Sequence, residues 1–126
     1  MLTSLSKMIA IPVYGMFTLY HPGGEVLQTV KCHPRMAAPL EASLQCLKTR
    51  LPDGYKLTYH GCYNYRNIAN TNKLSRHATG EAIDLNAGRE MKEEWAECFE
   101  KNGFIWGGRW KIPGPDPMHF ELRRKQ

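Results

Sequence analysis

A ten-residue segment from Ser75 to Asp84 combines residue types that bind metals. Its imidazole, His77, and its carboxylate, Asp84, stand seven positions apart on either side of Gly80. The first half is rich in Ser, Thr and Gly and predicts a loop, whereas residues 81–85 alternate polar and apolar side chains as a half-buried strand does. A turn followed by a strand can deliver both side chains to one point. The alternative is a capping histidine beside a solvated aspartate.

A second segment, residues 116–122, carries Asp116 and His119 three positions apart and ends in another alternating strand. Together with His77 and Asp84, His119 completes a set of three ligands. Zinc held by three protein groups keeps a fourth position for water, as catalytic zinc sites do. The remaining carboxylate, Asp116, can take a proton from that water. The two segments therefore predict metal-assisted hydrolysis.

The two segments together resemble the zinc peptidases of bacterial cell walls. This family includes the D-Ala-D-Ala carboxypeptidases and dipeptidases of vancomycin resistance and the L-alanyl-D-glutamate endopeptidases of phage endolysins. Its pattern is Ser-x-His-x-x-Gly-x-Ala-x-Asp, followed by Glu or Asp-x-x-His. The matching positions are Ser75, His77, Gly80, Ala82, Asp84, Asp116 and His119. The resemblance covers about residues 33–123.

Residues around the second segment look most like the endolysin branch. The run from Trp106 to Trp110 resembles the Trp-Gly-Gly-Asp-Trp of that branch, and His119-Phe120 resembles its His-Phe. Arg109 departs from the usual aspartate, so the role of that position is open. Trp106 and Trp110 either line the substrate cleft or pack in the core.

The resemblance also implies roles for individual residues. It implies one Zn²⁺ per chain, bound by His77, Asp84 and His119, with Asp116 as general base. Arg66 would stabilise the oxyanion or hold a substrate carboxylate, since a guanidinium is always charged and presents several donors in a plane. Ser75 either binds substrate backbone or caps the turn that aims His77. The expected substrate is the stem peptide of peptidoglycan.

The function implied by the branch is an L-alanyl-D-glutamate endopeptidase, and a D-alanyl-D-alanine carboxypeptidase is the alternative within the family. From a different class, a zinc-binding module that recognises the wall without turnover is possible, although the base at Asp116 argues against it. Glu121 shares a strand face with His119 and either orients that ligand or is solvated.

Length and charge set limits on the class of protein. A chain of 126 residues is long enough for one domain, and 17 basic against 12 acidic side chains give a formal charge of +5. This charge favours anionic partners or serves solubility. The basic residues are scattered apart from residues 123–125, so we expect no nucleic-acid partner. We expect a monomer without stable membrane insertion.

Four cysteines, at positions 32, 46, 62 and 98, show no zinc-finger spacing. We expect half-buried free thiols, with disulfides forming only after export. The apolar run of residues 8–20 is interrupted by Pro12 and Gly15 and predicts no secretory signal. Synthesis in a host cytoplasm, release by a membrane-permeabilising partner and action on the wall would fit a phage lysis enzyme.

The periodicities predict a single α+β catalytic domain with a metal-site core over about residues 55–122. A hairpin is expected over residues 13–32, a packing helix from Met36 to about Leu51, a core strand over residues 55–60 and a second helix over 90–101. We expect a central antiparallel sheet, as in the hedgehog and D-Ala-D-Ala peptidase type, to carry the zinc site with helices packed on its other face.

Overall fold

The computed structural model of the chain describes residues 7–13, 18–68 and 71–124. Within these residues the elements are β1 (Ile9–Pro12), β2 (Leu19–Tyr20), β3 (Thr29–Cys32), η2 (Pro34–Met36), α1 (Ala37–Lys48), β4 (Leu57–Thr58), η3 (Arg76–Thr79), β5 (Ala82–Asp84), α2 (Glu93–Glu100), β6 (Phe104–Trp106), η4 (Gly107–Arg109) and β7 (His119–Leu122). The η elements are 3-10 helices. Two helices and several small sheets confirm the α+β class.

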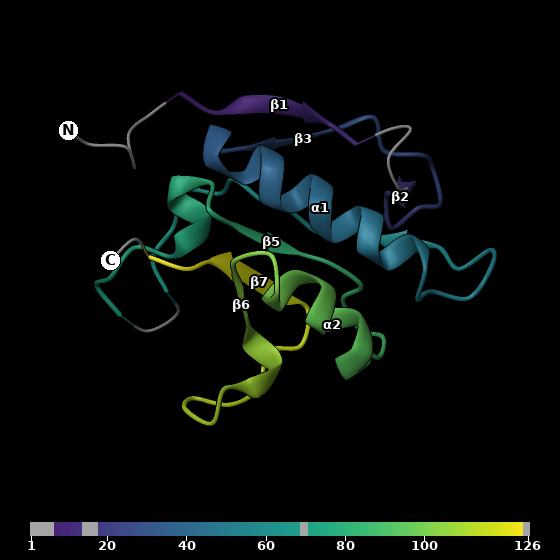
Figure 1. Ribbon diagram of the computed structural model, residues 1–126. Coiled ribbons are helices and arrows are strands. Elements are labelled where there is room, and N and C mark those ends of the chain that lie inside the picture. The colour runs from purple at the N-terminus through teal and green to yellow at the C-terminus, as the bar shows by residue number, and fades with distance from the viewer. Residues whose placement is uncertain (1–6, 14–17, 69–70, 125–126) are drawn as a thin grey trace.

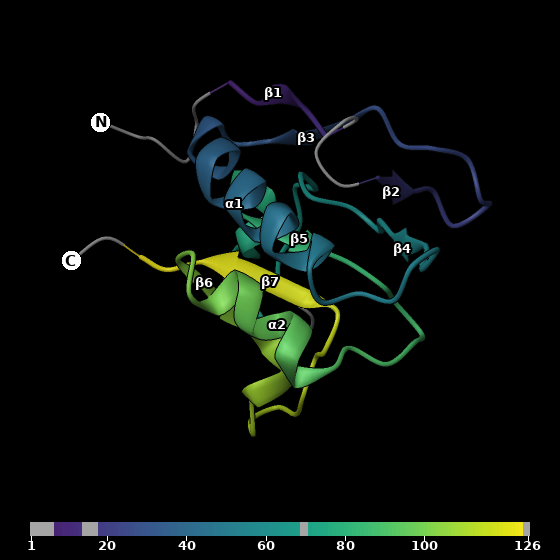
Figure 2. The ribbon, with the colours of Figure 1, turned by 45° about the vertical axis from the view of Figure 1, so that its right-hand side comes forward.

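Helix α1 lies between the β1–β3 ribbon and the three-stranded antiparallel sheet β5-β7-β6 (Figures 1 and 2). Its apolar positions Leu40, Leu44 and Leu47 recur every three or four residues and are fully buried, as the sequence pattern predicts. Pro39 falls in the first turn of α1, where a missing N–H breaks no helical hydrogen bond. Packing, rather than a capping side chain, therefore fixes this helix.

Helix α2 covers the sheet through aromatic side chains. Phe99 of α2 stacks on Phe120 of β7 with ring centroids 4.2 Å apart, and Trp95 is buried as expected. Phe99 also meets Phe104 of β6 edge to face. Both α1 and α2 lie on the same side of the sheet in Figures 1 and 2. The opposite face of the sheet is left for polar residues.

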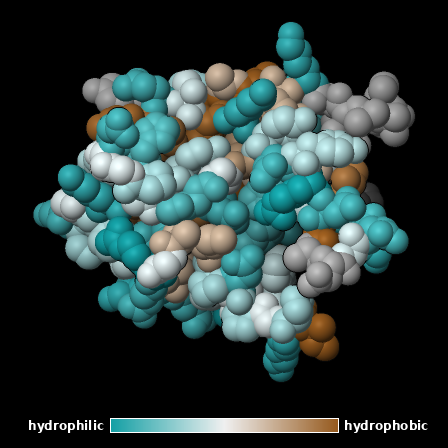
Figure 3. Space-filling model, turned by 180° about the vertical axis from the view of Figure 1, so that it is seen from behind, coloured by the Kyte–Doolittle hydropathy of each residue, from teal (hydrophilic) through white to brown (hydrophobic). Residues whose placement is uncertain are grey.

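The reverse side of the molecule is mostly hydrophilic, with hydrophobic side chains scattered in small groups (Figure 3). Among the described residues the most exposed large apolar side chain is Ile112, at 91%. Scattered exposed apolar residues are ordinary for a folded domain. No described helix combines the length and apolar character that a membrane crossing requires.

The hairpin expected over residues 13–32 is confirmed next to its turn, where Tyr20 and Val26 form an antiparallel bridge and Leu27 N donates to Leu19 O at 2.8 Å, but its strands pair further with other segments. Strand β3 pairs with β1 in antiparallel register, Ile11 opposite Val30, and β2 pairs in parallel with β4. The tight turn after β2 is present, since Gly24 N donates to His21 O at 2.8 Å. Residues 14–17 of the expected first arm lie outside the described residues. Alternation identifies buried faces, but it does not say which distant strand completes the pairing.

The four cysteines are not free thiols, which corrects the expectation from their spacing. Cys32 pairs with Cys62, and Cys46 pairs with Cys98. The first disulfide joins β3 to the segment that follows β4, and the second joins α1 to α2. Cysteines far apart in sequence are brought together by this packing.

Other regions of the chain also differ in detail from the expected elements. The core strand expected over residues 55–60 is regular only at Leu57–Thr58, with a further bridge between Tyr59 and Leu85. Strand β5 is fully buried rather than half-buried. Glu81 just before it is also buried, where it forms ion pairs with Arg35 and Arg76. These ion pairs make the burial of that carboxylate tolerable.

Candidate metal centre

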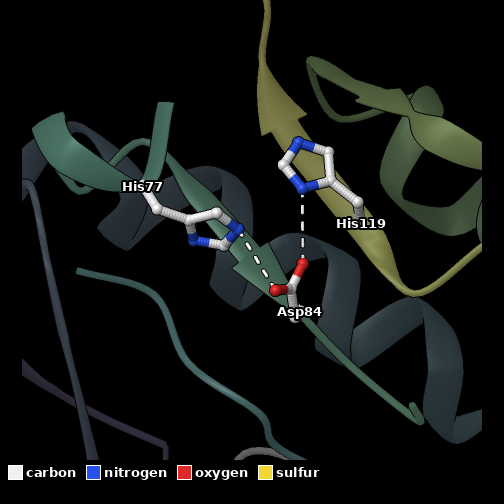
Figure 4. A group of neighbouring side chains, drawn as sticks. All are labelled: His77, Asp84 and His119. Carbon is white, nitrogen blue, oxygen red and sulfur yellow. Dashed lines mark hydrogen bonds and ion pairs between the residues drawn. The ribbon is translucent and has the colours of Figure 1, made fainter. Parts of the chain in front are cut away.

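Three side chains from two distant segments meet on the sheet face opposite the helices. His77, Asp84 and His119 each offer a ligand atom, and these atoms lie within 4.8 Å of one another. Their exposures are 2%, 7% and 7%. Figure 4 shows each ring directed at a different oxygen of the Asp84 carboxylate, with α1 passing behind the strands. This is the trio that the sequence pattern singled out.

The turn η3 aims His77. Ser75 caps η3, because its Oγ accepts a hydrogen bond from His77 N at 3.1 Å. Gly80 ends the turn with φ 71°, and a Cβ there would lie 2.6 Å from His33 N. Only glycine fits both the left-handed conformation and that close approach. Of the two roles open for Ser75, the structure shows the capping role.

The sheet aims the other two ligands. In the antiparallel pairing of β5 and β7, Asp84 lies directly opposite His119. Side chains of directly opposite residues lie on the same face about 5 Å apart at Cβ. A one-residue shift would send them to opposite faces. The register of this strand pair is therefore a condition for the site.

His77 shows a nitrogen that lacks a protein hydrogen-bond partner. Its Nδ1 lies 2.7 Å from the carbonyl oxygen of Cys62, which can only accept, so Nδ1 carries the proton. Nε2 lies 3.2 Å from Asp84 Oδ2 and finds no hydrogen bond although it is buried. A buried ring nitrogen without a hydrogen bond, beside a carboxylate, is a position that a cation would complete. The donor set thus fits a divalent metal with nitrogen and oxygen ligands.

His119 is held through both ring nitrogens. Its Nδ1 lies 3.3 Å from Asp84 Oδ1, and its Nε2 lies 2.8 Å from Glu121 Oε1. The nitrogen nearest the cluster is therefore Nδ1 for His119 and Nε2 for His77. The sequence left open whether Glu121 is solvated, and the structure places it against this ring.

These contacts shift the pKa values of the cluster. Burial alone would raise the pKa of Asp84, but its interactions with the His119 and His77 rings outweigh burial and lower the pKa to about 2. Burial alone would lower the pKa of His119, but Asp84 and Glu121 outweigh it and raise the pKa to about 9. In the absence of metal, a proton on His119 balances the carboxylates around it.

Asp116 lies beside the cluster because of a glycine. Asp116 N donates to Gly107 O at 2.8 Å, and His119 N donates to Asp116 O at 3.1 Å. A Cβ on Gly107 would lie 2.5 Å from Asp116 O and 3.2 Å from the Cβ atoms of both Asp116 and His119. Because Gly107 has no side chain, Asp116, the expected base, and the ligand His119 can both pack closely against it.

Residues 69–122 match the family model for D-alanyl-D-alanine carboxypeptidase. Over these residues the chain resembles that family. No curated protein and no solved structure gives a significant match. The match includes the three clustered side chains and Asp116, so the resemblance stated from the motif is confirmed. It indicates a peptidase of the peptidoglycan-cleaving kind with a possible metal site.

The two tryptophans that the endolysin-like run contributes have different positions. Trp106 is buried, and its Nε1 donates to Pro117 O at 2.7 Å, so it braces the Asp116 segment rather than lining a cleft. Trp110 is half-buried with its ring 5.1 Å from that of His119. Of the two, Trp110 is the one whose ring lies next to the cluster.

Arg109, where the endolysin branch of the family usually has aspartate, faces α2. Its guanidinium forms ion pairs with Glu93 and Glu100 and lies over the Trp106 ring. The hydrogen bonds to Glu100 and Glu93 raise the pKa of this exposed arginine further. Arg109 therefore connects the turn η4 to α2.

Arg66 is exposed, and among the described residues no hydrogen bond or ion pair joins its side chain to the cluster. Its backbone accepts a hydrogen bond from Ser75 N at 2.9 Å, in a short pairing centred on Asn67 and Leu74. Arg66 is thus the cross-strand neighbour of Ser75, and such neighbours share a face. Within the described residues its guanidinium has no hydrogen-bond or ion-pair partner. The substrate role expected for Arg66 stays a prediction.

Three features of the site were not singled out from the sequence. The Cys62 carbonyl is a backbone group and leaves no residue-type signal. The Cys32–Cys62 disulfide that anchors it joins cysteines thirty positions apart. Gly107 did have a signal, since paired glycines between two tryptophans often mark a close approach of backbone.

Proposed function

We propose that the protein is a zinc-dependent peptidoglycan hydrolase that cleaves the stem peptide, as an L-alanyl-D-glutamate endopeptidase of the phage endolysin kind. The supporting observation is the meeting of His77, Asp84 and His119 within 4.8 Å, with Asp116 held one backbone hydrogen bond from His119. Three ligands and a nearby carboxylate residue that can accept a proton are the parts that hydrolysis of a peptide bond needs.

Zinc, when bound by the three ligands, would lower the pKa of a coordinated water to about 7 and polarise the scissile carbonyl. The chain's own residues would do the rest. Asp116 takes the proton of the attacking water and returns it to the leaving amine. Arg66 offers a permanent positive charge to the oxygen on which negative charge develops. Neither a serine nor a cysteine is required as nucleophile.

Substrate position is proposed from the residues next to the cluster. The Trp110 ring beside His119 supplies an apolar wall, and its half-exposed edge suits a peptide that is part apolar and part polar. The net charge of +5 suits the acidic stem peptide and the anionic polymers of the wall. We propose that the enzyme acts on the cell wall after release from the cytoplasm of its host.

A second candidate is a D-alanyl-D-alanine carboxypeptidase, which is the activity that the matching family model describes. The two activities share the metal chemistry and differ in the bond that the substrate cleft presents. Purified sacculi incubated with the zinc-loaded protein distinguish them. New D-Glu amino termini support the endopeptidase, whereas free D-Ala supports the carboxypeptidase.

The same assay tests whether the protein is an enzyme or a wall-binding module. We expect Asp116→Asn to keep its zinc and to lose about 10²–10⁴-fold in rate, the range that a general base contributes. His119→Ala should lose both zinc and activity. Unchanged release of termini by Asp116→Asn would show that Asp116 is not the base. Absence of any release by the zinc-loaded wild type would leave the non-catalytic module.

A further inference from the structure

We infer that Glu121 is a positioning residue of the metal centre: its carboxylate fixes the His119 ring so that Nδ1 faces the ion. This inference rests on the proposed metal site and assigns a residue that the family motif does not contain. Glu121 Oε1 lies 2.8 Å from His119 Nε2, while His119 Nδ1 lies 3.3 Å from Asp84 Oδ1. Glu121 thus holds one side of the His119 ring, and Asp84 holds the other.

The strand itself brings Glu121 to the ring. Residues two apart on a strand share a face, so Glu121 follows His119 on the side of β7 away from the helices, while Phe120 points to the core and stacks on Phe99. Strand β7 is the middle strand of its sheet, with Glu121 opposite Ala82 on β5 and Ile105 on β6. Pairing on both sides leaves the backbone under Glu121 little freedom to move.

The surroundings of Glu121 favour a role at the ring over simple solvation. Its side chain is 20% exposed, and its two cross-strand neighbours are apolar and offer no charge. Within the described part of the chain, His119 is the residue that pairs with its carboxylate. A carboxylate largely removed from water needs such a partner.

Glu81 provides a contrast within the same sheet region. It is also buried, but its carboxylate forms ion pairs with Arg35 and Arg76 and accepts a hydrogen bond from Thr79. Those partners are permanently charged or neutral groups that tie segments together. Glu121 instead contacts a ring that belongs to the cluster, so its effect passes to the metal-facing nitrogen.

The chemical consequence concerns the tautomer of His119. Both ring nitrogens face carboxylates, but Glu121 at 2.8 Å is nearer than Asp84 at 3.3 Å. When the ring gives up one proton to bind an ion, the closer acceptor therefore keeps the proton on Nε2, and Nδ1 offers its lone pair to the ion. A carboxylate behind a ligating imidazole also strengthens that ligand, and loss of such a partner usually weakens metal binding 10–100-fold. Figure 4 shows Nε2 on the side of the ring away from Asp84, which leaves Nδ1 as the nitrogen nearest the carboxylate.

The test compares zinc affinity in Glu121→Ala and Glu121→Gln, measured by competition with a chromophoric chelator. We expect Glu121→Ala to bind zinc 10–100-fold more weakly than wild type. Glutamine keeps an oxygen acceptor, so Glu121→Gln should retain most of the zinc affinity that Glu121→Ala loses. Glu90→Gln, at an exposed position outside the cluster, is the control and should bind as wild type does.

A spectroscopic measurement separates positioning from a general effect on the fold. In zinc-loaded wild type, ¹⁵N chemical shifts of the His119 ring should show a protonated Nε2 and a metal-bound Nδ1. Affinities of both Glu121 variants within twofold of wild type, or a metal-bound Nε2 in wild type, would overturn the inference. If wild type itself binds no zinc, the proposed function fails instead, so the two failures are distinguishable.

Discussion

His77 and His119 approach the same carboxylate from two regions that hold them by different means. His77 lies in the capped turn η3, is almost fully buried and contacts the neutral backbone carbonyl of Cys62, which a disulfide ties to β3. His119 lies in the middle strand of a sheet and rests on a charged side chain, Glu121, from its own strand. One ligand is fixed by covalent and backbone structure, and the other by electrostatics.

This difference predicts which changes should affect metal binding by each histidine. Metal binding through His77 should respond to changes in the loop and its disulfide. The His119 side should respond to proton concentration and to the packing around η4 and β7. Five predictions can break or sharpen that contrast.

The largest effect is expected from the ligands themselves. His77→Ala and His119→Ala should each weaken zinc binding by more than about 100-fold, beyond the loss that follows removal of a supporting partner. Zinc content after gel filtration and competition with a chelator both measure this loss of zinc affinity. His21→Ala, in the exposed turn after β2, is the matched control and should keep its zinc. Retention of tight zinc by either ligand variant would remove that residue from the site.

The two disulfides should separate stability from metal binding. Cys32→Ala with Cys62→Ala, and Cys46→Ala with Cys98→Ala, should each lower the free energy of unfolding by about 2–4 kcal/mol. Only the first pair should also weaken zinc binding, by about tenfold, because only Cys62 carries the carbonyl that orients His77. Denaturant unfolding of the metal-free proteins and zinc competition give the two readouts.

Equal zinc affinities for the two double variants would contradict the covalent anchoring of His77. Loss of zinc in the Cys46 and Cys98 variant would show that the helices, rather than the loop, determine the site.

Gly107→Ala should damage the His119 side alone. The new Cβ would meet Asp116 O and the Cβ of His119, so the backbone must shift, at a cost of about 1–3 kcal/mol in stability. Wall hydrolysis should fall more than zinc affinity, because the base moves together with a ligand. Gly23→Ala, where a Cβ meets only the end of Glu25 at 3.4 Å, is the control. Full activity of Gly107→Ala would show that the turn tolerates a side chain.

The smallest effect is the release of a proton on metal binding. The pKa of His119 is raised from its ordinary value of 6.5 to about 9 in the metal-free protein, so the ring is charged at pH 7. Zinc needs the neutral ring and should displace about one proton at pH 7 and almost none at about pH 10. Zinc affinity should therefore rise with pH up to about 9. Calorimetry in two buffers of different ionisation enthalpy measures the number released.

The same shift affects the stability of the metal-free protein. A raised pKa means that His119 contributes stability that is fully present below about pH 6.5 and is lost as the pH rises through about 9. His119→Ala should remove this slope from the unfolding free energy. A wild-type curve that is flat over this range would contradict the charge balance described for the ring.

The sequence predicted the clustered residues well because two independent regularities agreed. The motif spacing selected His77, Asp84 and His119, and the period-two pattern placed Asp84 and His119 on strands. Period-two alternation could not give the register of these strands, because the register depends on how the two segments are aligned. The long connection between them, which contains α2 and β6, does not fix that alignment. The coordinates were needed to show that the two ligands lie directly opposite each other.

Elsewhere the sequence was less informative for the same reason. A strand was expected near the end of residues 13–32, but the partner of β3, Ile9–Pro12, precedes the expected hairpin. The cysteines carried no sign of their pairing, because distances between distant residues are set by packing. The Cys62 carbonyl was invisible because every residue has one.

The direct pairing of Asp84 with His119 has a thermodynamic consequence. An ion bound to both would act as a cross-link between positions 35 residues apart, enclosing α2 and β6 in a closed loop. Closing a loop of that size restricts the unfolded chain in the way a disulfide does. Loading with metal should therefore protect the amides of α2 from hydrogen exchange, although no ligand lies on that helix.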